Sequence, residues 1–314
     1  MEFMTTLDFF LKHADELQRV LNALIAPQSA PPVEKVSPEV EELITTYLSS
    51  PSVLEEHIEL IATSPHAGEL ERLLSSMVFL FISDTEHILL DEDEERIGLI
   101  IDGANSSEKA ETLKKIFYKT ENTDAKAALV RGLFYLAPYD SEIENLFLTT
   151  MRDEKLNPET AKLMYFEYLQ RKVEQIDSNP EVYEEVLTLL EEAKERFPDN
   201  DLIYEIDGHL GVKFILSGDT AAAQRHLKEV YEWTVYRGLA DIEPTYFSVN
   251  FLYFLAGYAE LLLDEGQREE AKRVIEDAKL LASKYREQFL QEFPEAYYSY
   301  LEELKEVEEK LRDY

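Results

Sequence analysis

Apolar residues recur three and four positions apart along most of this chain, which is the spacing of one face of an α-helix. The stripe is clearest over residues 3–25, where it consists of Phe3, Leu7, Phe10, Ala14, Leu17, Leu21 and Leu24. Runs in which Val, Ile or Thr alternate with polar residues are almost absent, so hairpins and parallel strand units are not indicated. The pattern predicts an all-α protein.

The first 26 residues are predicted to form an amphipathic helix, which we call the N-terminal arm. It ends at Ala26, and prolines at 27, 31 and 32 predict a proline-rich linker over residues 27–36. The arm either folds back onto the body, associates with a second copy of the chain, or docks to a partner. The residues expected to make the contact are Phe3, Leu7, Phe10, Leu17, Leu21 and Leu24.

Residues 37–155 are predicted to be an irregular region of helical hairpins. Prolines at 38, 51 and 65 suggest helix starts, because proline at a first helical position loses no needed N–H group. The expected helices in and just beyond this region span about 37–50, 51–64, 65–84, 107–120, 124–137, 141–152 and 158–175. The acidic tract 84–96 lacks the spacing of a calcium loop and is read as a solvated loop, with a weak cation or basic-partner site as the alternative.

A repeated arrangement of small residues begins after residue 180. Gly211 and Ala223 stand twelve positions apart around a Gly218-Asp219 turn, and Ala259 and Ala271 stand in the same way around Gly266. Small residues at such positions let two antiparallel helices approach closely, while Phe214 and Leu227 fill the space between them. Residues 156–314 are therefore expected to form stacked helix pairs with a final capping helix.

Residues 180–285 resemble tetratricopeptide repeats, and NPEVYEEVLTLLEEAKERFPDN is similar to the second helix and exit turn of such a unit. The resemblance implies a right-handed α-solenoid of antiparallel helix pairs. Two departures stand out. Asp207 and Leu255 occupy the positions of the family's tryptophan, and the 48 residues from Gly218 to Gly266 exceed the family's period of about 34.

The resemblance also implies a binding groove on the concave face, made by the first helix of each pair. The cationic positions with which some family members grip a C-terminal carboxylate carry no Lys or Arg in this chain. They hold Glu205, Gly208, His209 and Val212 in one unit and Tyr253, Ala256, Gly257 and Glu260 in the next. A carboxylate ligand is therefore disfavoured.

The stretch 244–258 is rich in aromatic residues, which either fill the space around a central helix or reach the surface as anchors for a ligand. The helices 203–217 and 245–264 are expected to line an acidic and aromatic groove for a basic or apolar peptide or helix. The candidate groove residues are Glu205, His209, Val212, Tyr246, Phe247, Tyr253 and Glu260.

The charge and composition of the chain limit the classes of partner that it is expected to bind. A formal charge of −34 disfavours direct binding of nucleic acid or anionic membranes and favours basic proteins or peptides. The chain has no cysteine, its first residues lack a signal-peptide pattern, and no apolar stretch is long enough to span a bilayer, so a cytoplasmic location is expected.

The search for chemistry returns little. No phosphate-binding glycine motif, nucleophile elbow or zinc-binding histidine pair occurs, so no enzyme, cofactor or metal site is expected. His209 is expected in the interior or at the groove edge with a local hydrogen bond, with ligand contact as the alternative, and His226 is expected to be exposed. The leading hypothesis is a scaffold or adaptor that binds another protein. The alternatives are a structural or regulatory subunit held by its arm or convex face and, less favoured, a small-molecule enzyme on a helical scaffold.

Overall fold

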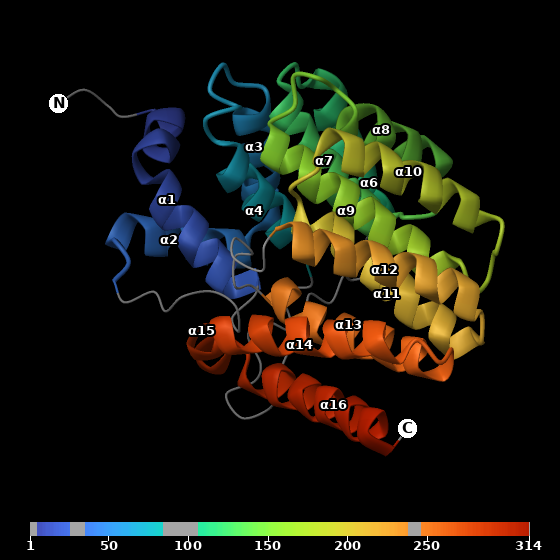
Figure 1. The fold of residues 1–314 in the computed structure, drawn as a ribbon. Coiled ribbons are helices and arrows are strands. Elements are labelled where there is room, and N and C mark those ends of the chain that lie inside the picture. The colour runs from blue at the N-terminus through green and yellow to red at the C-terminus, as the bar shows by residue number, and fades with distance from the viewer. Residues whose placement is uncertain (1–4, 26–34, 84–105, 238–245, 314) are drawn as a thin grey trace. The chain divides into compact units, whose positions relative to one another are not determined.

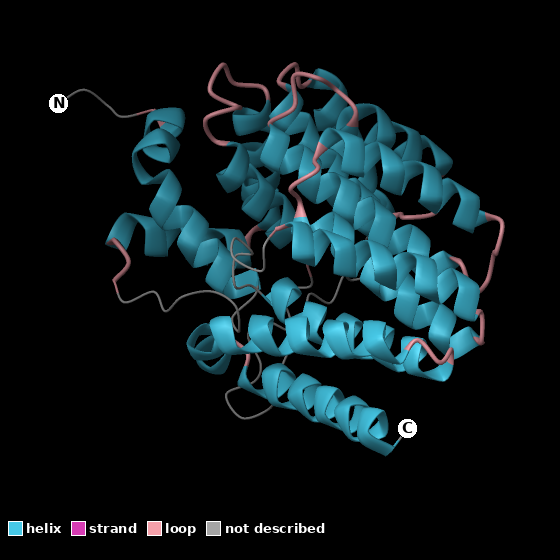
Figure 2. Ribbon diagram, in the orientation of Figure 1, coloured by secondary structure: helices cyan, strands magenta, loops and turns pink. Residues whose placement is uncertain are grey.

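The computed structural model describes residues 5–25, 35–83, 106–237 and 246–313, and within these ranges the protein is all-helical. Figure 2 shows the described chain as helices joined by short loops, without strands. The predicted all-α class is therefore confirmed. The acidic tract 84–96 and most of the predicted linker lie outside the described residues.

Contacts divide the chain into two compact units, residues 1–161 and 162–314. The division falls close to the predicted boundary at residue 156. Unit 1 contains α1 (Thr6–Ile25), α2 (Pro38–Ser49), α3 (Pro51–Ala62), α4 (Glu71–Ile82), α6 (Ser106–Lys119), α7 (Thr123–Leu136) and α8 (Ser141–Met151), and α9 (Pro158–Gln175) crosses the division (Figure 1).

Two of the three predicted proline starts are helix starts. Pro38 and Pro51 are the first residues of α2 and α3. The prediction for Pro65 is wrong, because residues 63–70 form turns and α4 begins only at Glu71. Gly68 lies within these turns, where a Cβ atom would come 2.9 Å from Asn122 Nδ2. A glycine disfavours helix, and here it also permits the close approach of the chain to Asn122.

The N-terminal arm belongs to the core of unit 1. α1 packs on α4 and α2, and Phe10, Leu17 and Leu21 are fully buried. Ser76 on α4 donates a hydrogen bond to Asn22 Oδ1 at 2.8 Å. The arm therefore folds back onto the body, which is one of the alternatives that the sequence leaves open, and Phe10, Leu17 and Leu21 make their contacts within the chain.

The other arm residues are less enclosed. Leu7 and Leu24 are half-buried, and Phe3 lies outside the described residues. An amphipathic stripe indicates that a helix buries one face, but it does not indicate which element covers that face. The sequence alone therefore leaves the packing partner of this helix open.

The centre of unit 1 is α7, which packs on α4, α6 and α8. Its buried face carries several small residues, and at Gly132 a Cβ atom would lie 2.4 Å from Val78 Cγ1 of α4. The small residue therefore sets how closely these two helices approach.

Unit 2 continues from α9 with seven further described helices. They are α10 (Val182–Arg196), α11 (Asp201–Ser217), α12 (Thr220–Tyr236), α13 (Tyr246–Asp264), α14 (Arg268–Lys284), α15 (Arg286–Glu292) and α16 (Pro294–Asp313). α11 packs on both α12 and α13, and α13 packs on both α14 and α16. The short helix α15 was not expected from the sequence.

Gly211, Gly218 and Gly266 have the roles that the sequence predicts for them. A Cβ atom at Gly211 would lie 2.4 Å from Leu227 Cγ, so this glycine permits the contact between α11 and α12. Gly218 and Gly266 follow α11 and α13 with φ angles of 80° and 75°, which L-residues rarely adopt. Gly208 adds a second close approach, because its Cβ atom would lie 2.3 Å from the Phe254 ring of α13.

The last helix covers the end of unit 2. α16 packs on α13 and α14, with Tyr297 and Leu304 buried and Tyr300, Leu301 and Leu311 packed at the edge of the core. This is the inward face that the sequence predicted for a capping helix.

Candidate functional site

The described rings of the aromatic stretch belong mainly to the core of unit 2. Phe251, Phe254 and Tyr258 are buried. Tyr253 is half-buried and stacks on Tyr300 of α16, with ring centroids 5.3 Å apart. Tyr253, which the sequence analysis names as a groove candidate, therefore lies between α13 and α16. The side chains of the other two predicted anchors, Tyr246 and Phe247, lie outside the described residues.

Glu205 is buried inside unit 2 instead of lying on a groove surface. Its side chain is 2% exposed, and its Oε1 atom accepts a hydrogen bond from Asn250 Nδ2 at 2.8 Å. Tyr300 OH donates in turn to Asn250 Oδ1 at 3.0 Å. The carboxylate therefore joins α11, α13 and α16. Its Oε2 atom has no hydrogen-bond partner among the described residues.

Glu260 is neutralised within the chain. Its carboxylate forms an ion pair with Lys310 of α16, and both side chains are about half exposed. The hydrogen bond to Glu260 raises the pKa of Lys310 above its ordinary value. Glu260 therefore holds α16 in place through this ion pair. The sequence pattern predicts it instead as an acid that faces a ligand in the groove.

The remaining groove candidates, His209 and Val212, line a hollow of about 670 Å³ between α9 and α11. We call it the α9/α11 groove. Its other lining residues are Gln170, Val173, Glu174, Asp177, Ile206, Lys213, Leu216 and Ser217. Leu216 is 83% exposed, which is the largest exposed fraction among the described large apolar side chains.

The polar groups around this groove are already paired. Asp177 accepts from Lys213 Nζ at 2.6 Å, and Glu174 accepts from Arg171 Nη1 at 3.0 Å. His209 Nε2 lies 3.2 Å from Glu205 Oε1, and its side chain is 47% exposed, in agreement with the predicted groove-edge position. The arrangement offers an apolar surface with a charged rim rather than a set of converging catalytic groups.

Sequence reasoning missed the α9 side of the groove. The helix itself was predicted, but nothing in its pattern shows that Val173 and Gln170 face α11. The sequence position of Leu216 could have indicated its exposure. Leu216 is an apolar residue at the end of a helix, just before the Gly218 turn, where few neighbouring residues can bury it.

A buried charged cluster lies among α10, α11 and α12. His226 is 2% exposed, so the expectation that it is exposed is wrong. Its Nδ1 atom lies 2.8 Å from Asp207 Oδ1, and its Nε2 atom lies 2.8 Å from Tyr183 OH. Asp207 Oδ2 lies 2.8 Å from Lys194 Nζ. The Asp207 carboxylate thus joins three helices.

Stability should depend on pH through Lys194. Burial alone would lower its pKa, but Asp207 and the neighbouring glutamates raise it from 10.5 to about 12. A raised pKa means tighter proton binding in the folded state, so the stabilisation is complete below about pH 10.5 and is lost as the pH approaches 12. The shift corresponds to about 2 kcal/mol.

Between pH 9 and pH 12, the free energy of unfolding of the parent chain should fall by about 2 kcal/mol more than that of the Lys194→Met variant. The variant lacks the amine whose titration causes this fall. Urea unfolding at a series of pH values measures this difference. Lys228→Met is the control, because Lys228 is 54% exposed. Parallel stability profiles for the parent chain and Lys194→Met would contradict the assignment.

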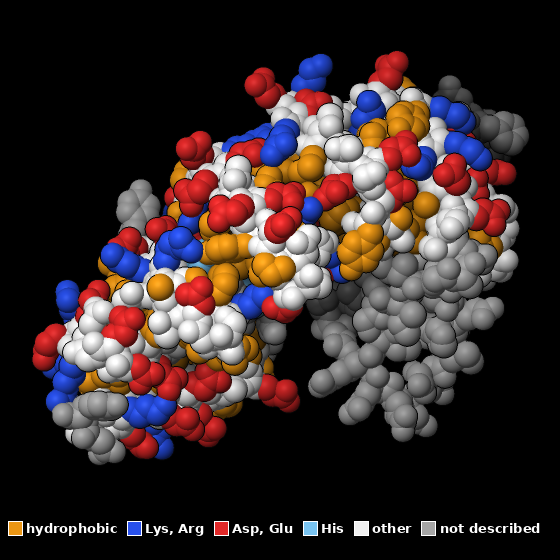
Figure 3. Space-filling view, turned by 90° about the vertical axis from the view of Figure 1, so that its right-hand side faces the viewer, with side chains coloured by type: hydrophobic (Ala, Val, Ile, Leu, Met, Phe, Trp, Pro, Cys, Tyr) orange, Lys and Arg blue, Asp and Glu red, His pale blue; other side chains and the backbone are white. Residues whose placement is uncertain are grey.

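On the face drawn in Figure 3, acidic and basic side chains are interspersed, and apolar side chains reach the surface between them. Within the described ranges, no group of three or more His, Asp or Glu residues could hold a metal ion. No helix there is both long enough and apolar enough to cross a membrane.

Comparison with known proteins assigns no family. No family model, no curated protein and no solved structure matches this chain. Membership of the tetratricopeptide family therefore stays a prediction, which rests on the residues of 180–285 and on the helix packing described above.

Proposed function

We propose that this protein is an interaction scaffold that holds apolar side chains of another protein in the α9/α11 groove. The observation that carries the proposal is Leu216, which is 83% exposed beside the half-buried Val212 in a hollow large enough for several side chains. Exposing a leucine to water is unfavourable, and covering it with a partner recovers that free energy.

The wider proposal is that unit 2 is a tetratricopeptide-like right-handed α-solenoid. The packing of α11 on α12 and α13, of α12 on α13 and of α13 on α14 supports it, as do the close approaches at Gly208 and Gly211. In such a stack α9 and α11 are the first helices of successive pairs, so the groove occupies the concave side, where the family binds its ligands.

The partner we propose is a peptide or helix with apolar anchors and basic flanking residues. The groove itself is aliphatic, which replaces the aromatic groove expected from the sequence. The net charge of −34 attracts basic chains over distances of about a Debye length, roughly 8 to 10 Å at physiological salt. A cytoplasmic location is part of this proposal.

The rival hypotheses gain less from the structure. Association through the N-terminal arm would need Phe10, Leu17 and Leu21, which are buried against the chain's own helices. We therefore propose neither an arm-mediated oligomer nor an enzyme.

Selection from a random-peptide phage library against the full chain tests the proposal. We expect enrichment of peptides that combine apolar and basic residues, and we expect Leu216→Gln to weaken the selected peptides by roughly tenfold or more, since burial of one leucine is worth about 1.5–3 kcal/mol. The control is Leu280→Gln on α14, because Leu280 is also exposed, at 57%.

Two outcomes would refute the groove. The first is that the library shows no enrichment. The second is that the selected peptides bind the Leu216→Gln and Leu280→Gln variants equally well. Because both residues are exposed, neither substitution should disturb folding, which circular dichroism of each variant verifies.

A further inference from the structure

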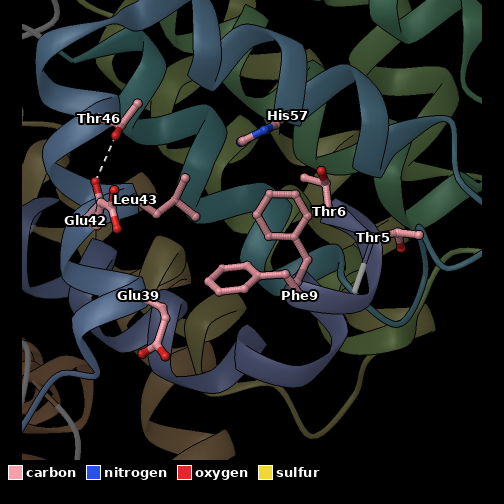
Figure 4. Close-up of a pocket in the computed structure, with 9 residues that line it drawn as sticks. Thr5, Thr6, Phe9, Glu39, Glu42, Leu43, Thr46 and His57 are labelled. Carbon is pink, nitrogen blue, oxygen red and sulfur yellow. Dashed lines mark hydrogen bonds between the residues drawn. The ribbon is translucent and has the colours of Figure 1, made fainter. Parts of the chain in front are cut away.

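Unit 1 contains a second hollow, of about 440 Å³, between the first turns of α1 and the helices α2 and α3. Figure 4 shows Phe9 projecting from α1 into this hollow, with Leu43 pointing toward Phe9 from α2. His57 reaches the hollow from α3. Thr5, Thr6, Phe10, Glu39, Glu42 and Thr46 complete the lining. We call it the Phe9 pocket. It is separate from the α9/α11 groove and does not depend on the proposed function.

The base of the Phe9 pocket is apolar and held in place. Phe10 is fully buried, and its ring meets the ring of His57 edge-on at 5.1 Å. The Phe9 ring stacks on His13 with centroids 4.6 Å apart. These contacts fix the aromatic side chains before any ligand arrives, which lowers the entropy lost on binding.

The α2 side of the pocket is negatively charged. Glu39 and Glu42 lie three residues apart, so both carboxylates project from one face of α2. Both residues are exposed, and neither forms an ion pair with a described residue. Two like charges at this spacing disfavour each other, and a cation placed between them relieves that repulsion.

Histidine supplies no opposing positive charge in this pocket. Partial burial lowers the pKa of His57, so its ring is neutral at pH 7. Burial also raises the pKa of Tyr47, and this protonated phenol lies 3.0 Å from His57 Nδ1, where it can donate a hydrogen bond. The described lining therefore carries two carboxylates and no Lys or Arg.

We propose that the Phe9 pocket binds a small organic ammonium ion with an apolar body. The apolar body would contact Phe9, Phe10 and Leu43, and the ammonium group would lie at Glu39 and Glu42. Charge complementarity selects the cation, and the volume lies within the range of about 300–1,000 Å³ that is usual for small-ligand sites. A cation near an aromatic face gains further attraction from the ring.

Ligand-observed nuclear magnetic resonance titration of the full chain with 4-phenylbutylammonium tests this site. We expect saturable binding with a dissociation constant of roughly millimolar or below, as suits a ligand of this size. The neutral 4-phenylbutanol and the anionic 4-phenylbutyrate have matched apolar bodies. Each should bind at least about tenfold more weakly than the ammonium ion, because neither supplies a cation.

Variants locate the site. Glu39→Gln with Glu42→Gln should weaken the ammonium ligand by roughly tenfold. Glu41→Gln with Glu56→Gln is the matched control, since these exposed acids of α2 and α3 lie outside the pocket lining and should leave binding unchanged. An absence of saturable binding, equal binding of the alcohol, or an equal loss in the control variant would each overturn the proposal.

Discussion

Replacement of Asp207 by Ala is expected to lower the free energy of unfolding by about 3 kcal/mol or more, because it breaks a buried ion pair from one side. The Lys194 ammonium group is only 11% exposed and would keep only the more distant carboxylates of Glu191 and Glu229. His226 would lose the acceptor at Nδ1 as well. Guanidinium-induced unfolding followed by circular dichroism measures the change.

The control for this prediction is Glu195→Ala, an exposed acid on α10 whose loss should change stability by less than about 0.5 kcal/mol. A double variant, Asp207→Ala with Lys194→Met, removes both charges and should recover part of the lost stability. If Asp207→Ala costs no more than Glu195→Ala, the cluster is not a structural element of unit 2.

Phe10→Ala is expected to destabilise unit 1 by about 3–5 kcal/mol, the usual cost of deleting a buried phenylalanine ring. Phe10 is fully buried, and the helix that carries it packs on α4 and α2. Amide hydrogen exchange along α4 reports the loss directly, because a weakened α1 would expose the backbone of the helix beneath it.

Lys12→Ala provides the comparison on the same helix, since Lys12 is exposed and should leave exchange along α4 unchanged. Equal exchange in the parent chain and in Phe10→Ala would mean that α1 is a separate arm after all. The result therefore separates packing of residues 3–25 on the body from the two alternatives in which this helix contacts a second copy or a partner.

Local signals predicted much of the fold. The helical period and Pro38 and Pro51 located helices to within a residue or two, and Gly211 marked a true close approach. These features succeed because a proline or a glycine acts on the backbone where it stands. The failure at Pro65 has the same cause, since the nearby Gly68 opposes the helix that the proline would begin.

The candidate site was less predictable, because burial depends on neighbours that are remote in the sequence. Glu205 and His226 look like surface residues in their own helices, yet Asn250 and Asp207 reach them from other helices. Tyr253 has the composition of a binding anchor, but Tyr300 covers it. Of the residues predicted for the groove, His209 and Val212 line the α9/α11 groove.

Photo-crosslinking tests the central claim, that the α9/α11 groove holds a partner's apolar side chains, most directly. Benzoylphenylalanine would be introduced at position 216 or, as a control, at position 280, and each chain irradiated with a peptide selected from the library. The proposed function predicts a crosslink from position 216 and none above background from position 280. Crosslinking from position 280 alone, or equally from both, would contradict it.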